Sequence, residues 1–276
     1  MSGEQSESLD DRAGEALRLR RLEPPGEPVS VAAFIEELAL PHHPSPPGAR
    51  PRVMLNMVAT ADGRATVGGR SGTISDRADR ELFHGLRSAV DGVLVGAGTI
   101  RTERYGRMIR DASVREARRA AGRSAEPLAC IVSGRLALPE DIPLLNEPEA
   151  RVVMLTASAA SLPDPSAQVD YVRSPDGQLD LVAAIAELGE RFDIRTLLCE
   201  GGPHLARQLL AAGLMDEIFL SVSPLLAGGE PAGGEALRIL AGAELEPPVA
   251  LDLLGVLGCG STLFLHYGVS VGGASD

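Results

Sequence analysis

Apolar runs and amphipathic stretches alternate at short intervals from about residue 51 to residue 269. Runs rich in β-branched residues predict strands, whereas apolar residues that recur at every third or fourth position predict helices. The strands are expected at 52–60, 92–96, 127–133, 151–156, 169–172, 194–200, 217–223, 249–256 and 261–269, and the helices at 76–88, 111–121, 180–190 and 203–212. This alternation is typical of an α/β domain.

Residues at the ends of these elements support the prediction. Asp76 and Asp79 form a capping-box pattern at the start of the first helix. Pro203 stands at the first position of the fourth helix, and Gly213 follows its last turn. The final two strands flank the turn sequence 258–260, which predicts an antiparallel hairpin. The central sheet is therefore expected to be mixed and flanked by helices.

Residues 1–50 differ from the rest of the chain because acids come first and proline and glycine then recur. Such a segment buries little apolar surface, so we expect an N-terminal extension that is partly disordered. Only residues 29–40 have apolar positions at helical spacing, and these are expected to dock on the core as one or two helical turns. The folded domain is expected to span residues 51–270.

Composition narrows the class of protein. The chain has 276 residues and a formal net charge of −12 with scattered basic residues, which argues against nucleic acid as a partner. The three cysteines, Cys130, Cys199 and Cys259, stand apart, which favours reduced thiols in the cytoplasm over disulfides or a metal site. No apolar stretch reaches the roughly 20 residues that cross a membrane. We therefore expect a cytoplasmic protein that binds no metal and no membrane.

Two strand-to-helix junctions are rich in glycine. The first is Gly96-Ala97-Gly98-Thr99, and the second is Gly201-Gly202-Pro203. The start of a helix offers free N–H groups and a positive dipole end, which suit a phosphate group. The missing Cβ atoms at positions 201 and 202 would let a diphosphate approach the backbone closely. Ordinary tight turns are the alternative.

A Rossmann dinucleotide site is a weaker interpretation of the first junction. Gly96 and Gly98 begin the G-x-G-x-x-G fingerprint, but Arg101 stands where its last glycine belongs. Another predicted strand and helix also precede this unit.

Several motifs follow one another in a specific order: DGR (62–64), SGTIS (71–75), LR (86–87), VLVGAGTIR (93–101), EGGPHL (200–205), DE (216–217) and SPLLAGG (223–229). Over roughly residues 51–268 the chain resembles the reductase domain of riboflavin biosynthesis, which is the C-terminal half of the bifunctional deaminase–reductase. The zinc signature of the deaminase half, H-x-E with P-C-x-x-C, does not occur. The chain therefore looks like a stand-alone pyrimidine reductase with a dihydrofolate-reductase-like fold.

This resemblance implies hydride transfer from NADPH to C1′ of a ribosylamino-pyrimidine, of the 5-amino-6-(5-phosphoribosylamino)uracil type. For the cofactor, the resemblance and the glycine junctions together point to Val58, Thr73, Gly96, Thr99, Ser133, Gly201, Gly202, Pro203, His204 and Leu205. For the substrate, the family pattern points to Asn56, Ser71, Arg87, Glu103, Arg110 and Glu200. Arg87 has a plainer alternative, which is a salt bridge to Glu81 or Asp91.

Two roles follow from residue chemistry. Arg135, just after a predicted strand, can bind the cofactor's 2′-phosphate with its planar guanidinium, or can be an exposed turn charge. Reduction of an imine also needs a proton at nitrogen, for which Glu103 and Glu200 are the candidate acids. Glu103 lies in a charged run and has a surface salt bridge as its alternative. Asp62 precedes Gly63 and is interpreted as a turn-former.

The substrate side departs from the family pattern. Asn56 replaces a usual Lys, Glu103 replaces a usual Asp, and Tyr105 and Arg107 replace residues of a DP-x-L run. A dihydrofolate- or pterin-type C=N reductase therefore stays open as an alternative, as does a non-catalytic, nucleotide-binding homodimer. Family members pair through their last strands, so segment 249–268 is expected to form a homodimer interface, with an ordinary core hairpin as the alternative.

Overall fold

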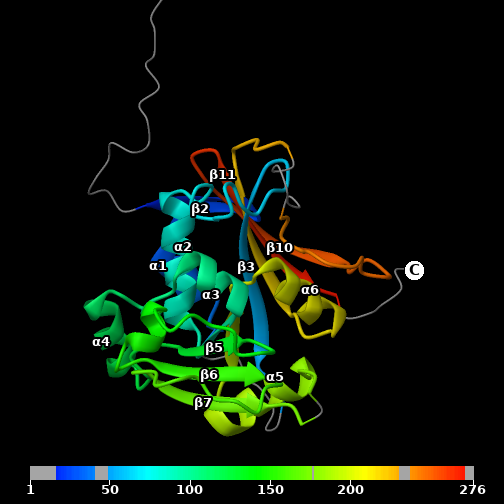
Figure 1. The fold of residues 1–276 in the computed structure, drawn as a ribbon. Helices are drawn as coiled ribbons and strands as arrows, with labels where there is room; N and C mark the ends of the chain where they lie inside the picture. The colour runs from blue at the N-terminus through cyan, green and yellow to red at the C-terminus, as the bar shows by residue number, and fades with distance from the viewer. Residues whose placement is uncertain (1–16, 41–48, 176, 230–236, 271–276) are drawn as a thin grey trace, which may run out of the picture.

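The computed structural model describes residues 17–40, 49–175, 177–229 and 237–270. Within these ranges one sheet of eleven strands runs in the order β2-β1-β10-β11-β9-β3-β8-β4-β5-β6-β7 (Figure 1). Neighbouring strands from β9 to β7 are parallel, and those from β2 to β9 are antiparallel. The predicted mixed sheet is confirmed, and a doubly wound Rossmann sheet is excluded.

The predicted elements all occur, with ends shifted by a few residues at most. The strands are β1 (Arg18–Glu23), β2 (Pro25–Ser30), β3 (Arg52–Thr60), β4 (Gly92–Gly96), β5 (Leu128–Val132), β6 (Arg151–Thr156), β7 (Gln168–Arg173), β8 (Thr196–Cys199), β9 (Glu217–Ser223), β10 (Leu251–Cys259) and β11 (Thr262–Val269). The helices are α1 (Val31–Glu37), α2 (Arg77–Ala89), α3 (Ala97–Glu103), α4 (Ala112–Ala120), α5 (Leu181–Phe192) and α6 (Pro203–Ala211).

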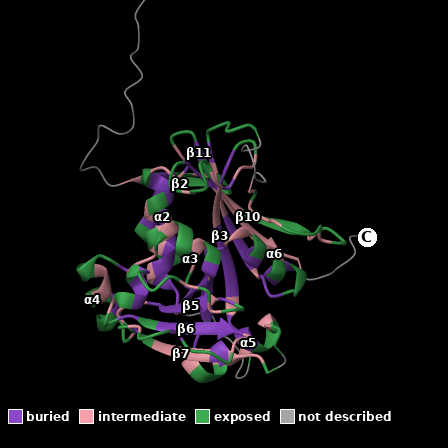
Figure 2. Cartoon of the chain, in the orientation of Figure 1, coloured by how far each residue is buried: buried purple, intermediate pink, exposed green. Residues whose placement is uncertain are grey.

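Helices cover both faces of the sheet, so its central strands are buried (Figure 2). Along β3 the side chains alternate: Met54 joins the apolar cluster under α1 and α2, while Val53 and Leu55 join the cluster under α5 and α6. Burial on both sides explains why these strands appear in the sequence as continuous apolar runs.

The N-terminal segment adds two strands that the sequence pattern did not predict. β1 pairs antiparallel with β10, where Arg20 lies opposite Gly258, and β2 then pairs with β1. The predicted docking of residues 29–40 is confirmed: α1 packs on α2, and a Cβ at Gly85 would lie 3.0 Å from Ile35. Charged residues dominate β1, so its pattern gave little indication of a strand. Residues 1–16 and 41–48 lie outside the described chain, so partial disorder there stays a prediction.

The parallel strands β3, β8 and β4 end side by side at the same edge of the sheet. β4 leads into α3 and β8 leads into α6, so both glycine-rich junctions lie at this edge. In Figure 1, β3 lies between α2 and α3 on one side and α6 on the other. The carboxyl ends of parallel strands are the usual place for a ligand in an open α/β sheet.

Candidate active site

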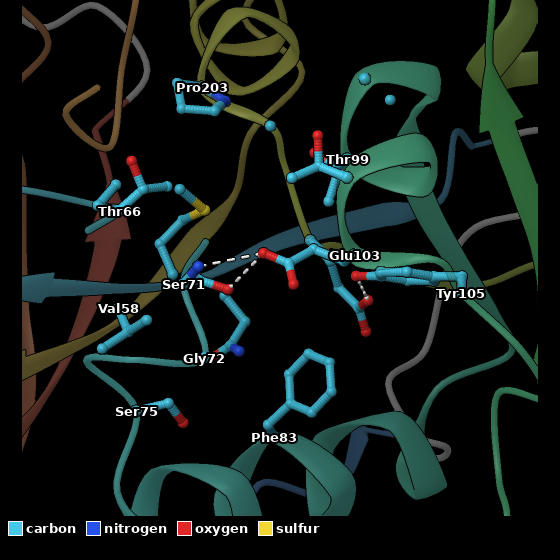
Figure 3. Close-up of a pocket in the computed structure, with 18 of the residues that line it drawn as sticks. Val58, Thr66, Ser71, Gly72, Ser75, Phe83, Thr99, Glu103, Tyr105 and Pro203 are labelled. Atoms are coloured by element: carbon cyan, nitrogen blue, oxygen red, sulfur yellow. Dashed lines mark hydrogen bonds between the residues drawn. The ribbon is translucent and has the colours of Figure 1, made fainter. Parts of the chain in front are cut away.

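A cavity of about 840 Å³ opens at this edge. Its walls come from the end of β3, the loop before α2, the cavity-facing side of α2, the segment from α3 to Arg110, and the start of α6. In Figure 3, Thr99 and Pro203 lie at one end of the cavity, Ser75 and Phe83 lie at the other, and Glu103 lies between them. The cavity thus has a glycine-lined end and an end rich in ionisable side chains.

The two glycine junctions form one continuous surface. The Gly96 N–H donates to the Gly201 carbonyl at 2.8 Å, which ties the end of β4 to the end of β8. A Cβ at Gly202 would lie 2.9 Å from Thr99 Oγ1, so only glycine fits there without displacement. Gly202 is the N-cap of α6 and makes no side-chain cap. The first turn of α6 therefore keeps free N–H groups that can donate hydrogen bonds to a bound anion.

Most predicted cofactor contacts lie on this surface. Seven of the predicted contacts line the cavity: Val58, Gly96, Thr99, Gly202, Pro203, His204 and Leu205. An eighth, Gly201, comes directly before Gly202 in the sequence. Three others lie elsewhere. The Thr73 hydroxyl donates to the carbonyls of Val67 and Arg70, Ser133 is buried after β5, and Arg135 is exposed on the next turn. Their contacts with a cofactor stay predictions.

Arg87 and Glu200 form a buried pair on the substrate side. Arg87 Nε and Nη2 donate to the two Glu200 oxygens at 2.6 and 2.7 Å, and the Tyr105 hydroxyl donates to Glu200 Oε2 at 2.6 Å. The Arg87 guanidinium also lies over the rings of Phe83 and Tyr105, 4.2 and 5.0 Å from their centroids. The plainer alternative, a salt bridge of Arg87 to Glu81 or Asp91, is not observed among the described residues: Arg87 pairs with Glu200, and Asp91 pairs with Arg123.

The surroundings of Arg87 and Tyr105 keep both side chains protonated. Burial alone lowers the pKa of Arg87, but the charge and hydrogen bonds of Glu200 raise it above the ordinary value. Burial, and then the Glu200 charge, raises the pKa of Tyr105 well above its ordinary range, so the phenol stays protonated and donates. Glu200 is thus held as an acceptor of three hydrogen bonds.

Glu103 faces the cavity from the last turn of α3. Its Oε1 accepts hydrogen bonds from the backbone N–H and the hydroxyl of Ser71, both at 3.1 Å (Figure 3). The neighbouring Arg104 pairs with Asp141, and the Arg101 side chain donates to a backbone carbonyl. Among the described residues, Glu103 therefore forms no surface salt bridge with these two arginines. The structure therefore brings together two residues that the sequence placed on the substrate side.

A positive region lies beside the buried pair. Arg80, His84 and Arg110 line the cavity, and the pKa of His84 is lowered by burial and by the charges of Arg87 and Arg110. Arg110 is exposed, which leaves its guanidinium accessible to an anion. Asn56, also predicted for the substrate, is buried and lines the same cavity.

Residues 51–262 match the family described as the RibD C-terminal domain. The chain belongs to this family. The resemblance inferred from the motifs is thereby confirmed.

Relatives of this chain carry reductase names. A 2,5-diamino-6-ribosylamino-4(3H)-pyrimidinone 5′-phosphate reductase of Archaeoglobus fulgidus is 29% identical over 188 residues, covering 65% of this chain and 83% of the relative. One of the same name from Methanothermobacter thermautotrophicus is 27% identical over 228 residues, covering 80% and 99%. A pyrimidine reductase-like protein of Corynebacterium diphtheriae superposes with a TM-score of 0.67 at 21% identity, covering 88% of this chain and all of that one. The fold of this RibD C-terminal domain is therefore that of the pyrimidine reductases.

The sequence patterns did not identify some residues of the site as cavity residues. Asp76 caps α2 as predicted, but the Asp79 carboxylate accepts from the Ser75 hydroxyl and lines the cavity. Phe83 and His84 also line it, and their helical spacing from Arg87 was the only indication in the sequence. Asp79, Phe83 and His84 therefore lie on the face of α2 that borders the cavity.

Asp62 behaves as the turn-former that the sequence indicated. It accepts from the Thr60 hydroxyl at 2.5 Å and from the backbone N–H groups of Ala227 and Gly228. These bonds, the Thr60 bond first, lower its pKa to about 2. Among the described residues of this domain, no group of His, Cys, Asp and Glu could hold a metal ion, and no helix is long and apolar enough to span a membrane.

Proposed function

We propose that this chain reduces a ribosylamino-pyrimidine 5′-phosphate with hydride from NADPH. The observation that carries the proposal is that one cavity joins a glycine-lined anion surface to the Arg87–Glu200 pair. Membership of the RibD C-terminal domain family and the similarity to named pyrimidinone phosphate reductases support a nicotinamide-dependent reductase of riboflavin biosynthesis. The preference for NADPH over NADH is also part of this proposal.

The residues present fit a dinucleotide. The bare backbone at Gly202, where a Cβ would meet Thr99, leaves room for a diphosphate at the uncapped start of α6. Val58 at the end of β3 would contact the nicotinamide, and Arg135 would bind the 2′-phosphate. When bound, the cofactor supplies the hydride, and the protein's task is to hold the acceptor carbon within about 3–3.5 Å of the donor carbon and to exclude water.

The opposite end of the cavity suits the pyrimidine phosphate. Arg110 and His84 lie where they can bind a 5′-phosphate, because both contribute positive charge or donors beside the cavity. A carboxylate has about four acceptor positions, and Arg87 and Tyr105 occupy three of those of Glu200. The remaining one can accept a ring N–H of the pyrimidine. Glu103 and Ser71 would bind hydroxyl groups of the ribose.

The cysteines and the exposed half of β10 indicate where the protein resides and how it assembles. Cys130 and Cys199 are free and buried, and burial raises the pKa of Cys199 to about 12, which suits a reducing cytoplasm. The first half of β10 exposes Leu251, Leu253 and Leu254, and β1 pairs with β10 only from residue 256 onward. A second copy of the chain would cover this apolar edge, so we propose a homodimer.

Cofactor titration and a reductase assay test the proposal. The purified chain should bind NADPH and oxidise it with the 2,5-diamino-pyrimidinone or the uracil form of the ribosylamino 5′-phosphate, and faster than with dihydrofolate or a dihydropterin. Faster turnover of a dihydropterin or of dihydrofolate would favour the alternative function, a pterin-type C=N reductase. Tight binding of NADPH with no oxidation by any of these acceptors would favour a non-catalytic binder.

A further inference from the structure

Asp79 is a buried carboxyl in the wall of the cavity, and neither the cofactor surface nor the substrate pair uses it. Its residue is only 7% exposed, in the first turn of α2. The Ser75 hydroxyl donates to its Oδ2, and the Ser221 hydroxyl of β9 lies beside it. Among the described residues no Lys, Arg or His forms an ion pair with Asp79, although Arg80 lies near on the same helix.

The sheet register places Asp79 beside the expected nicotinamide site. Ser221 is the pairing partner of Val58 in the parallel ladder between β3 and β9. Val58 and Asp79 both line the cavity, and Figure 3 shows Val58 and Ser75 along the same side. The carboxyl therefore lies in the cavity wall close to the strand position where the nicotinamide is expected.

The environment of Asp79 raises the pKa of its carboxyl above the ordinary value. Burial raises its pKa, the Ser221 and Ser75 hydroxyls oppose this rise, and the nearby charge of Asp76 adds to it. Of the other two acids of the cavity, Glu200 pairs with the Arg87 cation, whereas Glu103, like Asp79, accepts hydrogen bonds from a serine. A carboxyl whose pKa is raised keeps its proton to a higher pH, which is the property that a general acid needs.

We propose that Asp79 is the catalytic acid that protonates the imine nitrogen of the substrate. The inference rests on the proposed function and adds the proton donor to it. As hydride reaches C1′, the C=N π bond breaks and its electron pair passes to nitrogen. That nitrogen takes the proton from the Asp79 carboxyl, which gives a secondary amine and the Asp79 carboxylate. The reduced nicotinamide is oxidised, and Asp79 regains its proton from solvent through the open cavity.

This role predicts a pH dependence of known sign. The protonated form of Asp79 is active, so kcat should be constant at low pH and fall as pH rises through the pKa of this group in the ternary complex. The groups that face Asp79 are Asp76 and Arg80 from α2, Ser75 from the preceding loop and Ser221 from β9. The other ionisable groups that line the same cavity include Glu103, Glu200, Arg87 and His84.

Steady-state kinetics of Asp79→Asn, Asp79→Glu and Glu103→Gln decide the matter. Loss of the acid should lower kcat by about 10²-fold or more, abolish the falling limb of the pH profile and leave the Kd for NADPH within about threefold of wild type. Asp79→Glu should retain the limb at a shifted pH. Glu103→Gln should retain it in place, because Glu103 is not the donor.

The opposite outcomes overturn the proposal. They are a pH limb that persists unchanged in Asp79→Asn, or a limb that disappears in Glu103→Gln alone. A merely structural Asp79 would lower the melting temperature without changing the limb. If Asp79→Asn does not fold, an unshifted limb in Asp79→Glu rejects the role and a shifted limb supports it. Wild-type protein that does not oxidise NADPH with any pyrimidine would contradict the proposed function instead, which separates the two failures.

Discussion

Arg87 and Glu200, which lie 113 positions apart in the chain, meet through two hydrogen bonds of 2.6 and 2.7 Å in the wall of the cavity. One comes from α2 and the other follows β8, so the contact ties a helix to the edge of the sheet that carries the glycine junctions. Because both side chains are almost wholly buried, each charge depends on the other for most of its stabilisation.

Removing one member of this pair should cost much more stability than removing both. Arg87→Met leaves the Glu200 charge buried without a partner and is expected to lower the free energy of unfolding by about 3–5 kcal/mol. The double variant Arg87→Met/Glu200→Met should recover part of that loss but no reductase activity. Urea denaturation and turnover assays measure the two effects. A double variant that is less stable than Arg87→Met would contradict this account.

Gly202→Ala should impair cofactor binding. The new methyl group would lie 2.9 Å from Thr99 Oγ1 and fill the surface offered to the diphosphate. Titration should show the Kd for NADPH rising by about 10²-fold, the scale of one or two lost charge-assisted hydrogen bonds. Gly268→Ala is the control, because a Cβ there would make only an ordinary van der Waals contact, 3.6 Å from Leu254, and Gly268 is not among the residues that line the cavity. Equal affinities for both variants would remove the diphosphate from this position.

Arg135→Ala should reduce discrimination between the two nicotinamide cofactors. A guanidinium on the 2′-phosphate is worth about 1.5–3 kcal/mol, so the Kd for NADPH should rise 10-fold or more while that for NADH stays constant. Arg101 lines the cavity, and its side chain donates to the Ala137 carbonyl near the same turn. Arg101→Ala is therefore the informative comparison. A selective loss of NADPH affinity in Arg101→Ala alone would show that Arg101, and not Arg135, binds the 2′-phosphate.

Truncation distinguishes a loose extension from an integral one. Removing residues 1–16 should leave the unfolding midpoint unchanged. Removing residues 1–40 deletes β1, β2 and α1, with the buried Leu19, Phe34 and Leu40. Each large buried side chain contributes about 1.5–3 kcal/mol, so this protein should unfold at a much lower urea concentration. Equal midpoints for both truncations would show that the segment contributes nothing to stability.

Leu253→Glu should dissociate the proposed homodimer. The side chain is 49% exposed in the free half of β10, and a charge there would have to be buried by the partner copy. Sedimentation should give a dimer for wild type and a monomer for the variant. Val182→Glu serves as control, because Val182 is 54% exposed but lies on α5, far along the sheet from β10. A wild-type monomer would reject the interface.

Local patterns in the sequence determined most of the elements of this protein. The strand at 92–96, the Asp76 cap and the two glycine junctions follow from residues that are close in the chain, because periodicity, capping and turn geometry act over a few positions. The family motifs also placed Glu103, Ser71, Arg87 and Glu200 on one side of one site, and these residues do line one cavity.

Only the tertiary structure decided which of those residues bond to one another. Tyr105 reaches Glu200 over 95 positions of sequence, and β1 finds β10 near the other end of the chain. Asp79 has the sequence signature of a helix cap, yet the packing of α2 over β9 makes it a buried acid beside Ser221. Such contacts depend on how helices pack against the sheet, so spacing within any one segment cannot specify them.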